Sequence, residues 1–211
     1  MLADGRRGAL VGPRGDIAWM CVPGWDSDAV FAALIGGDGW YTVTPTQSYV
    51  WGGYYEPGSL IWRSRWTTTG GIVECRETLA YPGDAHRAVV LRRIMAVDGD
   101  ADLDVQLNPA AGFGAHPLRK IRRDGAGDWT ARAGDLHVRL RGCPAARADG
   151  SLLRSGVRLE AGRSRDLVLE VSDRPLPSPE PAGVLWRSTE AEWARAGTGG
   201  AAPCRHFGER G

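Results

Sequence analysis

Apolar and polar residues alternate with a period of two along most of this chain. Trp40–Thr44 alternates and stops at Pro45, and Ala101–Asn108 alternates over its whole length. Because successive side chains of a strand point to opposite faces of a sheet, this period predicts strands with one buried side. Short strands at regular spacing, with little helical periodicity between them, predict an all-β sandwich or barrel.

Turns rich in Gly, Pro and Asp divide these runs. Three pairs of runs are joined by such turns and predict β-hairpins: Ala9–Val11 with Ile17–Val22, Ser59–Thr69 with Ile72–Leu79, and Ala88–Val97 with Ala101–Asn108. In the second hairpin Trp62, Ser64 and Trp66 share one face of the first strand, and Arg63 and Arg65 share the other. We therefore expect one face in the core and one in water. Further short β-like runs continue to Val171.

The first hairpin ends in an aromatic-acidic corner, Pro23-Gly24-Trp25-Asp26-Ser27. The following Asp28–Ile35 is interpreted as a short helix that Gly36-Gly37 stops, with Asp26 or Ser27 as its N-cap. A large ring on a loop is costly to leave in water unless something packs on it. Trp25 and Asp26 are therefore candidates for contact with a sugar or a partner helix, and for Asp26 a capping role is the alternative.

The C-terminal part changes in composition. Ser172–Gly183 holds four of the thirteen Pro and is typical of an extended linker. Val184–Arg195 predicts the start of a helix with Leu185, Thr189 and Trp193 on one face. The chain is accordingly divided into a β-sandwich domain (1–171), a linker with a helix start (172–196), and a disordered or frameshifted tail (197–211).

The composition excludes several classes of function. A net charge of +1 does not favour nucleic acid or an anionic membrane, and only Arg119–Arg123 is a local candidate, interpreted as a solvated strand end or loop. Four dispersed Cys and four isolated His give neither metal-ligand spacing nor a redox motif, so we expect reduced thiols, no metal and no cofactor. No apolar run approaches the length of a membrane span, and we expect a cytoplasmic protein.

Two stretches carry a resemblance to a known family. Gly8–Gly37 combines the Ala-Leu-Val hairpin, the Trp-Asp-Ser corner and a Phe-Ala-x-Leu-Ile-Gly-Gly segment, and Tyr49–Thr78 follows with its aromatic-rich strands. This pattern resembles the amino-terminal domain of bacterial glycoside hydrolase family 15, the trehalase-like and glucoamylase-like enzymes. Many relatives carry Arg before the aromatic-Asp pair, whereas Gly24 stands here, so no role of that Arg is carried over. The resemblance implies a large twisted antiparallel β-sandwich, supersandwich-like, with one short helix after the first hairpin.

The resemblance also implies a function. Such enzymes hydrolyse α-glucosides with inversion, using two carboxylates about 6.5–9.5 Å apart, and in this family both lie in a helical-barrel catalytic domain. No part of this chain corresponds to that barrel, so we assign no catalytic residue here. The expected partners are the missing barrel and a glucose-containing oligosaccharide. The alternative is an independent carbohydrate-binding or protein-interaction β-sandwich.

Overall fold

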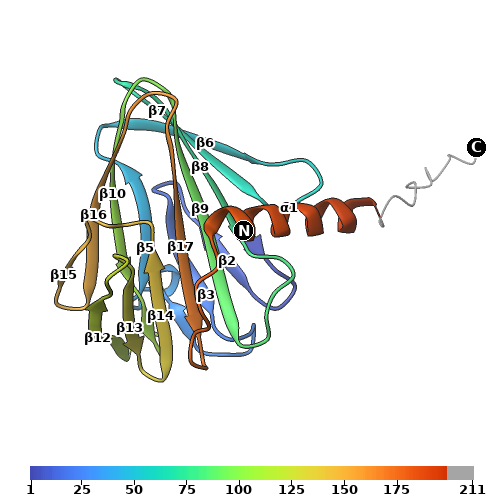
Figure 1. The fold of residues 1–211 in the computed structure, drawn as a ribbon, viewed down its shortest axis with the longest axis vertical. Coiled ribbons are helices and arrows are strands. Elements are labelled where there is room, and N and C mark those ends of the chain that lie inside the picture. The colour runs from blue at the N-terminus through green and yellow to red at the C-terminus, as the bar shows by residue number, and fades with distance from the viewer. Residues whose placement is uncertain (199–211) are drawn as a thin grey trace, which may run out of the picture.

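Two antiparallel sheets pack face to face, and the helix α1 (Ala182–Thr198) crosses the outside of one of them (Figure 1). The computed structural model describes residues 1–198. The predicted β-sandwich is confirmed. Inward-facing side chains of both sheets interdigitate in such a fold, so strands such as Trp40–Pro45 and Leu152–Leu159 alternate between buried and more exposed residues.

The eight-stranded sheet is built mostly from the N-terminal part of the chain. Its strands, in spatial order, are β1 (Leu2–Ala3), β2 (Gly8–Val11), β3 (Asp16–Cys21), β5 (Trp40–Pro45), β10 (Ala101–Asn108), β16 (Leu152–Leu159) and β15 (Arg147–Asp149), with β4 (Ala29–Phe31) also pairing with β3.

The nine-stranded sheet carries the helix. Its strands, in spatial order, are β11 (Ala110–Ala111), β12 (His116–Arg123), β13 (Trp129–Ala133), β14 (Leu136–Arg141), β17 (Ser164–Ser172), β9 (Arg87–Asp98), β8 (Gly71–Leu79), β7 (Trp62–Thr68) and β6 (Tyr49–Tyr55).

One continuous core fills the space between the sheets. Phe31 and Tyr41 enter it from the eight-stranded sheet, and Trp66 and Ile94 enter from the nine-stranded sheet, all without solvent exposure. Each such side chain contributes roughly 1.5–3 kcal/mol by leaving water. Cys21, Cys75 and Cys143 are buried free thiols. Cys204 lies outside the described residues.

Two of the three predicted hairpins are confirmed, β2–β3 and β7–β8. The third is wrong, because β9 pairs with β8 and β17 whereas β10 pairs with β5 and β16 in the other sheet. The turn Asp98–Asp100 takes the chain across the sandwich. Alternation predicts which side of a strand is buried but not which of the two sheets the strand joins, because the buried side faces the same core from either sheet.

The helix predicted over Asp28–Ile35 is corrected to a short strand, β4, followed by one 3-10 turn, η1 (Ala33–Ile35). Ala29, Val30 and Phe31 are all buried, and β4 pairs with β3. A helix of this length would have left part of that apolar run in water. The predicted stop is confirmed, because Gly36 ends η1 with a left-handed φ of 79°. The predicted N-cap is wrong, since Ala32 precedes η1 and no side chain caps it.

The chain leaves β17 through the Pro-rich segment and enters α1 (Ala182–Thr198). The predicted helix start is confirmed, and the helix continues to Thr198, two residues into the predicted tail. Residues 199–211 lie outside the described part, so the interpretation of the tail stays a prediction. No helix among the described residues is long and apolar enough to cross a membrane.

Candidate functional site

The corner after β3 places Trp25 on the surface. The side chain is 54% exposed, and its ring lies over Gly8 of β2, where an added Cβ would come within 2.2 Å of it. Ser27 Oγ accepts the backbone N–H of Gly24 at 3.1 Å. Ser27 therefore holds the corner itself rather than capping a helix.

Trp25 and Asp26 line one hollow of about 520 Å³ together with Arg6 and Ala85. The next residue, His86, accepts the N–H of Asp173 with its carbonyl at 3.2 Å, just after β17 ends. The corner thus lies at the same end of the sandwich as the exit toward α1. Asp26 is exposed and has no hydrogen bond or ion pair within residues 1–198.

Helix α1 packs on the outer face of the nine-stranded sheet through one side. Leu185 and Trp186 are buried against an apolar patch formed by Val89, Leu91 and Val168. The same helix face continues through two more contacts, in which Thr189 Oγ1 accepts the N–H of Tyr81 at 3.3 Å and Trp193 stacks on the Tyr81 ring at 4.2 Å. The predicted face of Leu185, Thr189 and Trp193 is therefore the one that packs on the sheet.

Three arginines stand side by side beneath this helix. Arg63, Arg76 and Arg93 are direct cross-strand neighbours on β7, β8 and β9. Like charges in opposite positions destabilise a sheet unless other groups neutralise them. Trp186 covers two of them, with the guanidinium carbons of Arg76 and Arg93 at 4.8 and 5.2 Å from its ring centroid. Such cation–π contacts are favourable when they are shielded from water.

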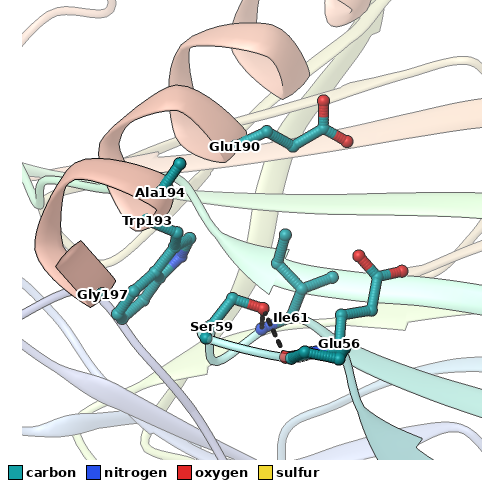
Figure 2. A pocket seen from close by; sticks show the side chains of 9 residues that line it. Glu56, Ser59, Ile61, Glu190, Trp193, Ala194 and Gly197 are labelled. Carbon is teal, nitrogen blue, oxygen red and sulfur yellow. Dashed lines mark hydrogen bonds between the residues drawn. The ribbon is translucent and has the colours of Figure 1, made fainter. Parts of the chain in front are cut away.

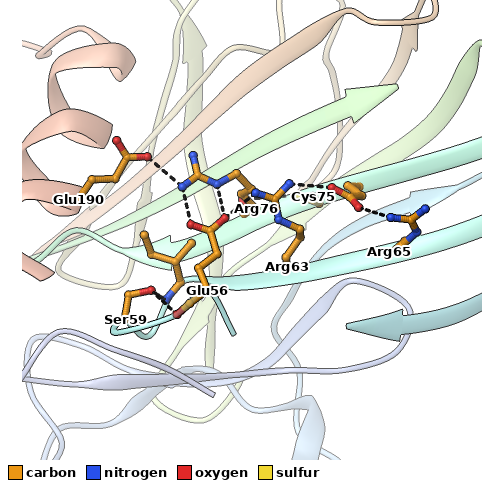
Figure 3. A network of polar contacts seen from close by, with 9 residues as sticks. Glu56, Ser59, Arg63, Arg65, Cys75, Arg76 and Glu190 are labelled. Atoms are coloured by element: carbon orange, nitrogen blue, oxygen red, sulfur yellow. Dashed lines mark hydrogen bonds and ion pairs between the residues drawn. The ribbon is translucent and has the colours of Figure 1, made fainter. Parts of the chain in front are cut away.

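Carboxylates from four segments of the chain neutralise these arginines, and Figure 3 shows the contacts around Arg76. Glu56, in the loop after β6, accepts hydrogen bonds from Arg76 at 2.6 and 2.7 Å and from Arg63 at 2.7 Å. Glu190 of α1 pairs with Arg76 at 2.9 Å. The remaining pairs are Arg63–Glu74, Arg65–Glu74 and Arg93–Asp166, at 2.7, 2.8 and 2.7 Å.

An open groove of about 340 Å³ lies between α1 and the loop after β6 (Figure 2). Glu56 and Ser59 line it from the loop, and Glu190 and Trp193 line it from the helix. Burial alone would raise the pKa of Glu56, but hydrogen bonds and attraction from Arg76 and Arg63 outweigh it and hold that pKa below its usual value. This carboxyl is therefore ionised at neutral pH and occupied by its arginine partners.

A second buried carboxyl, Glu77, lies between the two sheets. It pairs with Arg92 at 3.1 Å, and neither side chain has solvent exposure. Arg92 also stacks over Tyr41, at 4.2 Å from the ring centroid. Burial raises the pKa of Glu77, and Arg92 opposes that effect. No substrate can reach this pair, so it belongs to the core.

Sequence reasoning identified the corner but missed the polar contacts around Arg76. The alternation did place Arg63 and Arg65 on one face of β7, which was expected to be in water. That expectation is wrong for Arg63, because α1 and the loop holding Glu56 cover this part of the sheet. The available signal was the run of arginines and glutamates at alternate positions, 63, 65, 74 and 76.

Comparison with known proteins places these features in a family. A family model described as "Trehalase-like, N-terminal" matches residues 1–128. A trehalase from Mycobacterium tuberculosis (strain ATCC 25618 / H37Rv) is 28% identical over 240 residues, covering 99% of this chain and 35% of the relative. A trehalase from Mycolicibacterium smegmatis (strain ATCC 700084 / mc(2)155) is 28% identical over 227 residues, covering 93% and 34%. The chain spans about a third of the length of these curated relatives.

Proposed function

Because the chain belongs to the trehalase-like N-terminal family, we propose that it serves as the non-catalytic N-terminal domain of a glycoside hydrolase of family 15. In this proposal a helical-barrel domain outside these 211 residues supplies the acid and base for inverting α-glucoside hydrolysis. The relatives that match are trehalases about three times as long. Trehalose is therefore the first substrate to test for the whole protein.

The observation that carries this proposal is the attachment of α1. The helix is bound to the sandwich by the buried Trp186, by the Glu190–Arg76 ion pair and by the Trp193–Tyr81 stack. A helix held by contacts along its length points in one direction. This is what a domain needs if it is to set the position of another domain, and a loose linker would not provide it.

Glu56 and Glu77, the two carboxyls described above, do not suit the role of a general acid. A general acid has to hold its proton near neutral pH, which requires a raised pKa and access to substrate. Glu56 is accessible but its pKa is lowered, and Glu77 has a raised pKa but is inaccessible. Neither meets both conditions. The buried free thiols fit a reducing compartment, and we propose the cytoplasm.

A second candidate function is an independent carbohydrate-binding or protein-interaction sandwich. The edge strand β6 favours it, because Val50, Trp51, Tyr54 and Tyr55 are all exposed there. Exposed aromatic rings on a sheet edge are suited to contact with sugars or with another protein. The experiment below separates the two candidates.

The test compares the 211-residue chain with a fusion in which it replaces the matching third of the M. tuberculosis trehalase. We expect no glucose release from trehalose or maltose by the chain alone, and trehalose hydrolysis by the fusion. Activity of the chain alone that disappears on mutation of one of its own carboxylates would contradict the proposal. Glucan binding by the chain alone, together with an inactive fusion, would favour the second candidate.

A further inference from the structure

The cationic side chains of β12 and β13 differ from the arginines of β7, β8, β9 and β14 in whether a carboxylate lies beside them. Eight arginines of β7, β8, β9 and β14 lie within 4 Å of a carboxylate: Arg63, Arg65, Arg76, Arg87, Arg92, Arg93, Arg139 and Arg141. Five cations of β12 and β13 have no ion pair within the described residues: Arg119, Lys120, Arg122, Arg123 and Arg132. Within the described residues these two strands thus carry cations that no ion pair neutralises.

The strand register gathers part of that charge into one row. Arg119 of β12 lies opposite Arg132 of β13, which lies opposite His137 of β14. Arg132 donates a hydrogen bond to His137 Nε2. Burial and the neighbouring Arg132 lower the pKa of His137, which keeps the imidazole neutral and able to accept this bond. His137 therefore orients the guanidinium of Arg132 without adding charge.

A β-bulge adds a third cation. The register shifts between Arg119 and Arg122, and Lys120 adopts a left-handed φ of 53°. Regular alternation would send the Lys120 side chain to the face opposite Arg119, yet both residues line the same hollow. The left-handed backbone costs a residue with a side chain about 1–2 kcal/mol. Bulges that re-aim a side chain, and strained residues, concentrate at functional sites.

The hollow between these residues measures about 390 Å³. This lies within the range of small-ligand sites. His116 and Asp135 complete its polar lining, so three permanent cations face one carboxylate. The surplus of two positive charges matches a doubly charged anion.

We propose that this hollow binds a tetrahedral oxyanion, either inorganic phosphate or the phosphoryl group of a small ligand. Two guanidinium groups can each donate paired N–H bonds to oxyanion oxygens, and an ammonium group adds a point charge. A phosphate group has enough oxygens to accept from all three, and Asp135 can accept from a hydroxyl of the ligand. The site lies on β12 and β13 and does not depend on the proposed function.

The experiment titrates the 211-residue chain with sodium phosphate in a calorimeter at constant ionic strength. We expect saturable binding at one site per chain. Arg119→Gln and Arg132→Gln should each weaken binding about ten-fold or more, because each removes charge-assisted hydrogen bonds. Arg122→Gln is the matched control, since it removes the same charge from the same strand but does not line the hollow. It should leave the Kd within about two-fold, the change expected from long-range charge alone.

Lys120→Gly gives a second measurement that does not depend on the arginines. Glycine adopts the left-handed backbone without strain, so the variant should fold at least as stably as the parent while binding phosphate more weakly. Parallel titrations with glucose 6-phosphate and glucose distinguish the two sources of the oxyanion. Tighter binding of the sugar phosphate than of phosphate identifies a phosphorylated sugar, and equal binding identifies free phosphate. Absence of saturable binding by either anion, or equal weakening by Arg122→Gln, overturns the proposal.

Discussion

At the scale of single residues, Arg76 is the point on which the contacts beneath α1 converge. Its guanidinium binds Glu56 of the loop after β6 and Glu190 of the helix, and it stacks on Trp186. Its side chain is only 13% exposed. One residue thus connects three separate segments of the chain.

Replacing Arg76 by Gln should therefore lower the free energy of unfolding by about 1–3 kcal/mol, because two carboxylates lose their main partner in a partly buried site. Arg65→Gln is the control, since Arg65 is 44% exposed and, within residues 1–198, pairs only with Glu74. Arg65→Gln should lower the free energy of unfolding by less than about 1 kcal/mol. Urea unfolding at neutral pH measures both. Equal losses in the two variants would contradict the central role of Arg76.

The same variant has a predictable pH dependence. The pKa of Glu56 is lowered from its ordinary value of 4.5, so its pairing stabilises the fold fully above that value. This contribution is lost as the pH falls below 4.5 and passes through the lower pKa of the folded state. The difference in stability between the parent and Arg76→Gln should shrink over the same range. A difference that stays constant as the pH falls would show that Glu56 is not the partner that matters.

At this scale the sequence allowed only part of the site to be predicted. Trp25 was expected on the surface because it follows a Pro-Gly corner, and it is exposed. Its contact with a sugar or a partner helix stays a prediction. The role of Arg76 could not be predicted, because its partners Glu56 and Glu190 lie 20 and 114 positions away along the chain. No local pattern reports contacts over such separations.

At the scale of elements, the strands were predictable and their pairing was less so. The β7–β8 hairpin followed from two alternating runs joined by Gly70-Gly71. The turn at Asp98–Asp100 had equally clear signals but connects strands in different sheets. Its Gly99 packs against the Gly70–Gly71 turn, where an added Cβ on Gly71 would come 1.8 Å from the Asp98 carbonyl oxygen. Tertiary contact of two turns therefore decided this connection.

The attachment of α1 gives a prediction for the element. Trp186→Ala removes the largest buried side chain of the helix and leaves a cavity over Val89 and Leu91. The free energy that holds the helix on the sheet should fall by about 3–5 kcal/mol. Amide hydrogen exchange should therefore accelerate throughout α1, while β9 and β17 stay protected. Val184→Ala is the control, because Val184 is 39% exposed and is not part of this apolar cluster. Unchanged exchange in the helix would contradict the assigned docking.

At the scale of the whole molecule, two features that are distant in sequence lie at one end of the sandwich. The corner holding Trp25 shares its hollow with Ala85, and the neighbouring His86 is hydrogen-bonded to Asp173 where the chain turns toward α1. A domain that α1 positions would therefore approach the end that carries the exposed ring. This arrangement is the reason to treat the corner as a contact site.

The fusion with the mycobacterial trehalase tests this arrangement. In it, Trp25→Ala should reduce kcat/KM for trehalose by about ten-fold, equivalent to about 1.4 kcal/mol, if the ring packs on sugar or on the barrel. Asp26→Asn keeps the shape of the side chain and removes its charge. A loss of kcat/KM that is smaller than the loss in Trp25→Ala would therefore assign Asp26 a polar contact. Val97→Ala is the control, because Val97 is also exposed, at 47%, but is not among the residues that line this hollow. Trp25→Ala and Asp26→Asn should leave the free energy of unfolding of the 211-residue chain almost unchanged, since both side chains are exposed. Parent-like kcat and KM in both would reduce the corner to a turn held by Ser27.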